Sequence, residues 1–130
     1  KQEIIEFLFK NLEQFGDEKE DIEKAINYSL KENNSFGGFV LQSFEEEKIS
    51  CVVVVNRTGM QGYIPENILV YIATHNELRG KGIGKRMMLK AIEIAKGNIA
   101  LHVEPDNPAR YLYEKIGFKS KYLEMRYIKG

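Results

Sequence analysis

The clearest chemical pattern in this chain of 130 residues is the segment 78–86, Leu-Arg-Gly-Lys-Gly-Ile-Gly-Lys-Arg. It lies between an apolar, strand-like run and a helix-like run. A glycine loop at the start of a helix presents bare backbone N–H groups, and the helix N-terminus adds a partial positive charge. Glycines also let an anion approach the backbone closely. With their flanking basic side chains, residues 79–85 therefore predict a binding site for a diphosphate.

The glycine spacing distinguishes between the known phosphate-binding loops. A P-loop has the form Gly-x-x-x-x-Gly-Lys-Ser/Thr, but here Arg79 occupies the first glycine position and Arg86 the position of the magnesium-binding hydroxyl. A dinucleotide fingerprint has the form Gly-x-Gly-x-x-Gly. If it starts at Gly80, Lys85 occupies the position of the third glycine, and if it starts at Gly82, Met87 does. The spacing that is satisfied is Arg-x-x-Gly-x-Gly, formed by Arg79, Gly82 and Gly84.

Apolar periodicity predicts the elements that hold this loop in place. The first half of the chain predicts helices over 2–15 and 20–33, then strands over 36–44, 49–56 and 68–74. The second half predicts a helix over 83–95, a strand over 99–103, a helix opened by Pro108 with Asn107 as its cap, and a final strand over 118–128. The strand 49–56 is the most β-branched and should be central and buried.

The connection from strand 68–74 through a helix to strand 99–103 predicts a right-handed βαβ unit with parallel strands. We therefore expect an α+β fold, a mixed sheet with the element order ααβββαβαβ and one central parallel βαβ unit. The length fits a single domain over residues 1–130.

Composition excludes several classes of partner. The formal net charge is zero, so there is no electrostatic basis for binding nucleic acid or an anionic membrane. The longest apolar run, Cys51 to Val55, is far shorter than the about 20 residues of a membrane span. Because no export signal opens the chain and a lone cysteine cannot form an internal disulfide, we expect a cytoplasmic protein. We also expect no metal site.

Two segments carry a resemblance to a known family. The loop formed by Arg79, Gly82 and Gly84 resembles the pyrophosphate-binding loop of the GNAT superfamily of acetyl-CoA-dependent N-acetyltransferases. Residues 106–118 are similar to that family's Asn-containing turn and the helix that ends in Leu-Tyr-Glu-Lys-x-Gly-Phe. The element order also resembles the GNAT acyl-CoA N-acyltransferase fold, although the strand that usually precedes its first helix is not visible before Ile4.

The resemblance implies how acetyl-CoA would bind. Its pantetheine arm would enter between two splayed parallel strands and pair with the backbone of Ile72, Ala73 and Thr74. Its diphosphate would lie on the loop, carried here by Arg79, Gly80, Lys81, Gly82, Ile83, Gly84 and Lys85, with Arg86 as a further candidate. In the turn before the last helix, Asp106 keeps the spacing of the family's Asn, whereas Asn107 keeps its residue type. Asn107 is counted among the cofactor-binding residues, and which of the two contacts CoA stays open.

The resemblance also implies catalytic roles. Tyr113 matches the family's Tyr in Leu-Tyr-Glu-Lys, which lies near the thioester sulfur and can act as general acid toward the CoA thiolate. Glu66, just before the strand 68–74, is a candidate general base. His75, at the end of that strand, and an ordered water are the alternatives.

The function implied is the transfer of the acetyl group of acetyl-CoA to a primary amine by direct attack on the thioester. The alternative is a non-catalytic module that binds acetyl-CoA for regulation or interaction. In this fold the acceptor, a small-molecule or peptide amine, would be contacted by residues 15–36 and 57–67, which carry no recognisable code. Exposed strand edges are compatible with a homodimer.

Overall fold

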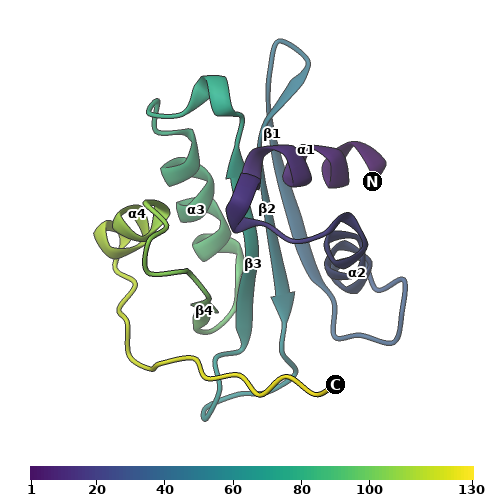
Figure 1. The fold of residues 1–130 in the computed structure, drawn as a ribbon, viewed down its shortest axis with the longest axis vertical. Coiled ribbons are helices and arrows are strands. Elements are labelled where there is room, and N and C mark those ends of the chain that lie inside the picture. The colour runs from purple at the N-terminus through teal and green to yellow at the C-terminus, as the bar shows by residue number, and fades with distance from the viewer.

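The strand-forming segments pair into one four-stranded sheet of order β1-β2-β3-β4 in the computed structural model, which describes residues 1–130 (Figure 1). The strands are β1 (Gly38–Glu45), β2 (Lys48–Arg57), β3 (Asn67–Thr74) and β4 (Ile99–Leu101). The strand β2 runs antiparallel to both β1 and β3, whereas β3 and β4 are parallel. The predicted mixed sheet with one parallel βαβ unit is confirmed.

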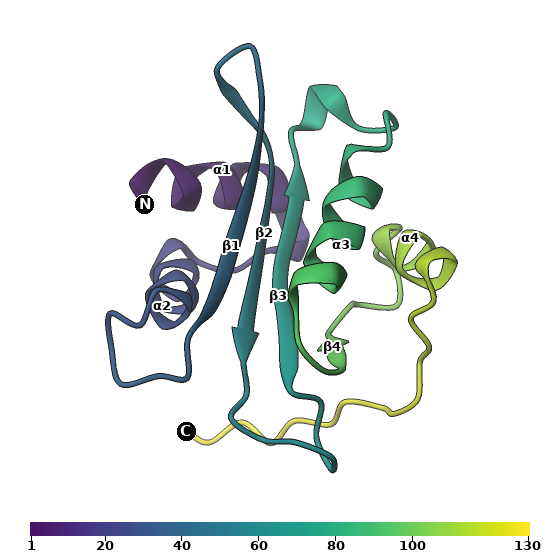
Figure 2. The ribbon, with the colours of Figure 1, turned by 180° about the vertical axis from the view of Figure 1, so that it is seen from behind.

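Helices cover both faces of this sheet. They are α1 (Gln2–Leu12), α2 (Lys19–Ser29), α3 (Ile83–Ile94) and α4 (Ala109–Ile116), with short 3-10 turns η1 (Glu13–Phe15) and η2 (Asn76–Leu78). Figures 1 and 2 show α1 and α2 on one side of the sheet and α3 and α4 on the other. None of the helices has the length and apolar character that crossing a membrane requires.

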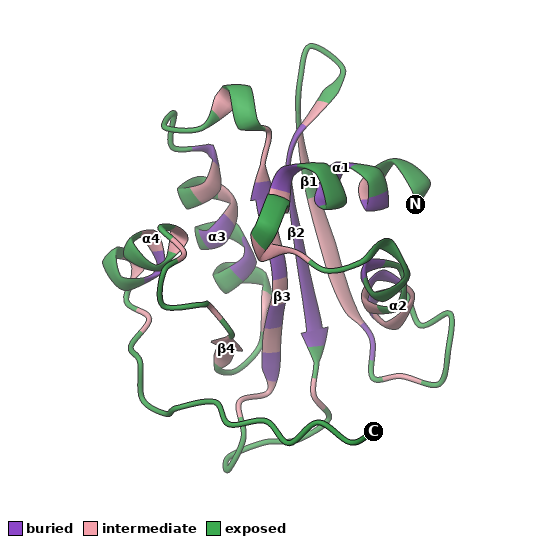
Figure 3. Cartoon of the chain, viewed as in Figure 1, coloured by how far each residue is buried: buried purple, intermediate pink, exposed green.

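The strand β2 carries the core because it is buried on both faces (Figure 3). Val52 and Val54 belong to the cluster under α1 and α2, whereas Cys51, Val53 and Val55 belong to the cluster under α3 and α4. This alternation is the two-residue period of a strand. A strand covered on both sides needs apolar residues at every position, and this explains the continuous β-branched run that predicted a central strand.

A bulge in β3 opens the sheet. Val54 pairs with Tyr71 and Val55 with Leu69, so Val70 is an extra residue on β3. Val70 and Tyr71 consequently pack toward the same face, the one under α1 and α2, as expected for a bulge. The parallel pairing of β3 with β4 extends only as far as Leu69. From Val70 to Thr74, β3 therefore has no strand on its β4 side.

The last predicted strand is wrong in this structure. Residues 118–128 form no strand, and the observed order ends at α4. The chain instead runs across the end of the sheet at which β3 begins (Figures 1 and 2). Five of its apolar side chains are more than four-fifths exposed: Tyr122, Leu123, Met125, Tyr127 and Ile128. An alternating pattern favours extended backbone, but a strand also needs a neighbour for its hydrogen bonds, and this segment has none.

Candidate active site

The site begins at the gap between β3 and β4. On its other side β3 is paired with β2, with Ile72 opposite Val53 and Thr74 opposite Cys51. Toward β4, the backbone of Ile72, Ala73 and Thr74 has no strand partner. An extended ligand that carries amide groups can pair with such a free strand edge. The three residues predicted to present their backbone thus lie at a free edge.

The glycine loop follows the open end of this gap after the short turn η2. Gly80 and Gly82 have φ angles of +83° and +80°, and a Cβ built on either one would meet nothing within 4 Å. Both positions therefore need glycine for its backbone conformation, while the space beside them is open. Gly82 is the N-cap of α3, so the first backbone N–H groups of this helix have no partner within the helix.

Gly84 has a different role from the two loop glycines. A Cβ there would lie 3.3 Å from Thr74 Oγ1 and 3.7 Å from Leu112 Cδ2. The absence of a side chain lets the first turn of α3 sit close to both the end of β3 and α4. The loop, the free edge of β3 and the helix that carries Tyr113 are thereby brought together.

The charges around the loop are mostly unpaired. Lys81, Lys85 and Arg86 are exposed and form no ion pair within the chain. Basic residues in the first turn oppose the helix dipole by about 0.3–1 kcal/mol each. A bound polyanion would offset this repulsion between the basic side chains and the helix dipole, so the arrangement suits a diphosphate.

Arg79 differs from its basic neighbours because its side chain is already engaged. Its Nη2 donates a hydrogen bond to the backbone oxygen of Asn11 at 2.6 Å, and its Nη1 lies 3.6 Å from a carboxylate oxygen of Glu13. Asn11 is buried and also accepts a hydrogen bond from the backbone N–H of Asn76 at 3.0 Å. The structure thus directs the Arg79 side chain toward the end of α1, while its backbone remains in the loop.

Tyr113 lies on α4 and is 8% exposed. Its ring packs edge-on against Phe118, with centroids 6.1 Å apart. Burial raises the pKa of Tyr113 to about 12, so the hydroxyl keeps its proton throughout the physiological range. The hydroxyl has no hydrogen-bond partner in the chain, yet no fully buried side-chain polar atom is left unpaired. The hydroxyl therefore reaches solvent and is available to donate.

Asn107, the predicted cap, lies one residue before Pro108, which is the N-cap of α4. Its Oδ1 accepts a hydrogen bond from the backbone N–H of Ala109 at 2.9 Å, which leaves its amide NH₂ free to donate. Asp106 is exposed and forms no ion pair or hydrogen bond through its side chain. The contact with CoA remains a prediction for either residue.

Glu66 lies at the opposite end of β3 from the glycine loop. Its carboxylate accepts hydrogen bonds from the backbone N–H groups of Gly62 at 3.0 Å and Asn98 at 2.7 Å. These bonds favour the charged form, and they hold the pKa of Glu66 below its ordinary value. The carboxylate therefore ties the β2–β3 loop to the turn before β4, and its role as a base remains a prediction.

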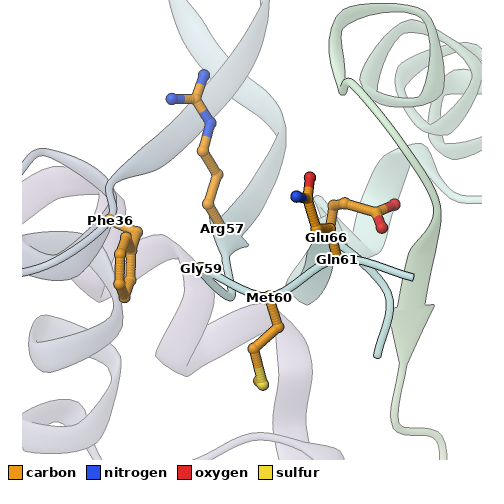
Figure 4. A pocket seen from close by; sticks show the side chains of 6 residues that line it. All are labelled: Phe36, Arg57, Gly59, Met60, Gln61 and Glu66. Atoms are coloured by element: carbon orange, nitrogen blue, oxygen red, sulfur yellow. The ribbon is translucent and has the colours of Figure 1, made fainter. Parts of the chain in front are cut away.

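A shallow cavity of about 440 Å³ lies at this same end of the sheet (Figure 4). It is lined by Phe36, Arg57, Gly59, Met60, Gln61 and Glu66. The side chains of Arg57, Met60 and Glu66 point in different directions rather than toward one point. The cavity therefore lies at the opposite end of β3 from the glycine loop, and its lining comes from the segments expected to contact the acceptor.

His102 lies near the candidate site, although it is not among the predicted residues. It follows Leu101, the last paired residue of β4, and its side chain is exposed. The residues Ile99, Leu101 and Val103 alternate along the chain and all pack under α3 and α4. This alternation could have predicted that His102 lies on the other face of the sheet. The structure brings it to the point where β3 and β4 separate.

Comparison with known proteins points to one family. The sequence profile of the acetyltransferase (GNAT) family matches residues 2–118. The chain is also 37% identical over 57 residues to the cysteine-rich protein 2-binding protein of Mus musculus. That match covers 43% of the chain and 7% of the mouse protein, so the chain corresponds to a small part of that relative.

Solved structures share the fold. A putative acetyl transferase from Pyrococcus furiosus superposes with a TM-score of 0.65 at 25% identity, covering 98% of this chain and 89% of that one. An aminoglycoside 6'-N-acetyltransferase from Acinetobacter haemolyticus superposes with a TM-score of 0.69 at 14% identity, covering 99% and 91% of the two chains. The second likeness concerns the fold alone.

Proposed function

Because the chain belongs to the acetyltransferase (GNAT) family, we propose that it transfers the acetyl group of acetyl-CoA to a primary amine. The observation that carries the proposal is the free edge of β3 from Val70 to Thr74, which leads through the short turn η2 into the glycine loop. A strand-like pantetheine arm and a diphosphate are joined in CoA in that same order. One ligand can therefore occupy both features.

The residues present suit acetyl-CoA. The left-handed backbone of Gly80 and Gly82, with open space beside each, supports close approach of the diphosphate. Lys81 and Lys85 supply unpaired positive charge. The carbonyl and N–H groups of Ile72, Ala73 and Thr74 would pair with the amides of the pantetheine arm, and the free amide NH₂ of Asn107 offers a further donor.

Tyr113 would act as the general acid. When the amine nitrogen attacks the thioester carbonyl, the C–N bond forms and the C–S bond breaks with its electron pair going to sulfur. The nitrogen releases its extra proton to a base or to solvent. The Tyr113 hydroxyl, which has no partner within the chain, donates its proton to that sulfur and regains one from solvent. Proton transfer of this kind typically contributes about 10²–10⁴-fold to the rate, and alignment of the two reactants about 7–11 kcal/mol.

Turnover over a panel of amines tests the proposal. The panel would include polyamines, amino acids, aminoglycosides, peptide N-termini and peptide lysines, with release of the CoA thiol as the readout. Steady release on any member supports the acetyltransferase. Calorimetric binding of acetyl-CoA without turnover on any amine would support the alternative, a non-catalytic acetyl-CoA-binding module.

A further inference from the structure

The C-terminal segment 119–129 carries exposed apolar side chains that the proposed function does not use. Five of them are more than four-fifths exposed: Tyr122, Leu123, Met125, Tyr127 and Ile128. From Lys119 to Gly130 the chain makes no backbone–backbone hydrogen bond. The segment crosses the end of the sheet at which β3 begins (Figures 1 and 2). Contiguous exposed apolar groups mark an interaction surface, and unpaired backbone groups in an extended chain can template another strand.

The side chains of this segment alternate as they do in a half-buried strand. Side chains two residues apart share a face of extended backbone, so Leu123, Met125 and Tyr127 form one apolar face. Glu124 and Arg126 lie on the other face, and the ion pair between them, at 2.6 Å, agrees with this placement. The segment therefore has the pattern of a strand and lacks only a partner.

The free edges of the sheet itself are poorer partners for this segment. The strand β4, at one edge, is only three residues long. The strand β1, at the other edge, carries a bulge between Ser43 and Phe44, and a bulge hinders the pairing of a further strand. A second copy of the segment has the matching length and the same alternation.

We propose that this segment pairs with the same segment of a second copy of the chain, as an antiparallel two-stranded ribbon that makes the protein a homodimer. A closed dimer of identical chains has a two-fold axis, so each contact occurs twice. Residues that oppose each other across the ribbon must lie on the same face, and this requires the axis to pass beside one residue. That residue opposes its own copy, and its neighbours pair at equal distances on either side.

Charge selects Met125 as the residue on the axis. In that alignment Glu124 of each copy lies opposite Arg126 of the other, so both pairs have opposite charges. An axis at Glu124 would oppose two carboxylates, and an axis at Arg126 would oppose two guanidinium groups, and like charges directly opposite destabilise paired strands. Lys121 opposes Lys129 only at the two ends of the ribbon, where long charged side chains reach water.

The same alignment also matches the apolar side chains. Tyr122 lies opposite Ile128, and an aromatic side chain opposite a β-branched one stabilises neighbouring strands. Leu123 lies opposite Tyr127 on the other face, and Met125 opposes Met125. Each large apolar side chain of the segment thereby gains an apolar neighbour.

The apolar face of the ribbon also needs cover, because an isolated two-stranded ribbon is marginally stable in water. The β2–β3 loop lies at the end of the sheet that the segment crosses, and it exposes Tyr63 and Ile64. We assign this cover to these two side chains. Neither of them lines the cavity described above, so the cavity stays open to an acceptor.

Sedimentation equilibrium tests the dimer. We expect wild type to dimerise as its concentration rises. Glu124→Arg opposes two arginines at both charged pairs, and like charges across an interface are costly, so the dissociation constant of the dimer should rise about tenfold or more. The double variant Glu124→Arg with Arg126→Glu restores opposite charges at both pairs and should return the dissociation constant to within about threefold of wild type.

Oxidative cross-linking tests the alignment. In Met125→Cys the two new cysteines oppose each other on the axis, and a disulfide should join the copies into a dimer on a non-reducing gel. Leu123→Cys is the matched control, because its two cysteines would lie four residues apart along the ribbon, about 14 Å. A disulfide spans Cα atoms no more than about 7 Å apart. The native Cys51 is buried and common to both variants.

Each contrary outcome overturns the proposal. A wild-type protein that stays monomeric at every concentration has no such interface. A dimer that Glu124→Arg leaves intact, or that the double variant does not restore, is not joined by the charged pairs of this ribbon. Cross-linking of Leu123→Cys as readily as Met125→Cys contradicts the axis at Met125. Circular dichroism establishes that the variants fold, and none of these measurements depends on acetyl transfer.

Discussion

The guanidinium of Arg79 donates a hydrogen bond to the backbone oxygen of Asn11 at 2.6 Å, although 68 positions separate the two residues. The amide side chain of Asn11 in turn accepts from the backbone N–H of Asn76 at 3.0 Å and donates to the oxygen of Phe7 at 2.9 Å. These bonds join the C-terminal end of α1 to the segment that enters the glycine loop. The end of α1, which leads into the segment 15–36 expected to contact the acceptor, and the loop expected to bind acetyl-CoA are thus held in one fixed arrangement.

Replacing Arg79 should therefore cost stability. Arg79→Ala removes a charged hydrogen-bond donor from the Asn11 oxygen, and such bonds contribute about 1.5–3 kcal/mol. Because the side chain is half exposed, we expect a loss of about 1–2 kcal/mol in urea unfolding. The matched control is Lys81→Ala, which removes an exposed charge without a partner and should change stability by less than about 0.5 kcal/mol. Equal losses in the two variants would contradict the structural role of Arg79.

The loop glycines allow a second comparison within the same chain. Gly82 and Gly62 have φ angles of +80° and +83°, and neither Cβ would meet an atom within 4 Å. Alanine at either position should cost a similar about 1–2 kcal/mol of backbone strain. Only Gly82→Ala should lower the affinity for acetyl-CoA, by about tenfold or more in calorimetry, because only Gly82 lies in the glycine loop proposed to bind the diphosphate. A comparable loss of affinity in Gly62→Ala would show that the effect is indirect.

Features set by local sequence could be predicted. The glycine loop is contiguous, so the conformations of Gly80 and Gly82 follow from residue types within a few positions. The burial of β2 follows from its uninterrupted β-branched residues, and the parallel pairing of β3 with β4 follows from the helical crossover between them. Asn107 could be assigned as a cap because the following proline marks a helix start.

Features that depend on distant partners could not be predicted. Val70 has no residue type that marks a bulge, yet the bulge decides where the sheet opens. The Arg79 side chain was expected at the diphosphate, but its ion pair with Glu13 depends on where α1 ends. The face on which His102 lies depends on the register of a strand of three residues. The pattern of residues 118–128 predicted a strand. The prediction failed because a local pattern carries no information about the neighbour that a strand requires.

Glu66 should support the fold only in its charged form. Its pKa is lowered in the folded state, so its contribution to stability is present above the ordinary value near 4.3. That contribution is lost as pH falls through the folded value. We expect Glu66→Gln to lower the thermal unfolding midpoint at pH 7. The difference from wild type should shrink once the pH falls below the ordinary carboxyl value and should vanish below the lowered pKa of the folded protein. Glu23→Gln, at an exposed carboxylate with no partner, is the control and should show no such dependence.

The same Glu66→Gln protein also tests the predicted base. Turnover that survives the substitution would remove Glu66 from the mechanism. A stability equal to wild type at pH 7 together with abolished turnover would instead support Glu66 as the base and contradict its role in joining the two loops.

Tyr113→Phe should reduce turnover without lowering the affinity for acetyl-CoA. The hydroxyl has no partner in the chain, so its removal leaves no unpaired group and should change stability at pH 8 by less than about 0.5 kcal/mol. Loss of the proton donor should lower kcat by about 10²-fold or more, with acetyl-CoA affinity within about twofold by calorimetry. An unchanged kcat would mean that Tyr113 serves packing against Phe118 alone.

The same variant should also be the more stable protein in alkali. Burial raises the pKa of Tyr113 from 10.0 to about 12, so above pH 10 the unfolded chain releases a proton that the folded chain still holds. Wild type therefore loses stability as pH rises from about 10 to about 12, by about 1.4 kcal/mol at pH 11 from this group. Phenylalanine cannot ionise, and Tyr71, whose pKa is also raised, is common to both proteins. Urea unfolding at pH 8 and pH 11 should show that Tyr113→Phe loses less unfolding free energy than wild type between the two pH values. Equal losses in both proteins would mean that Tyr113 ionises equally in the folded and unfolded states.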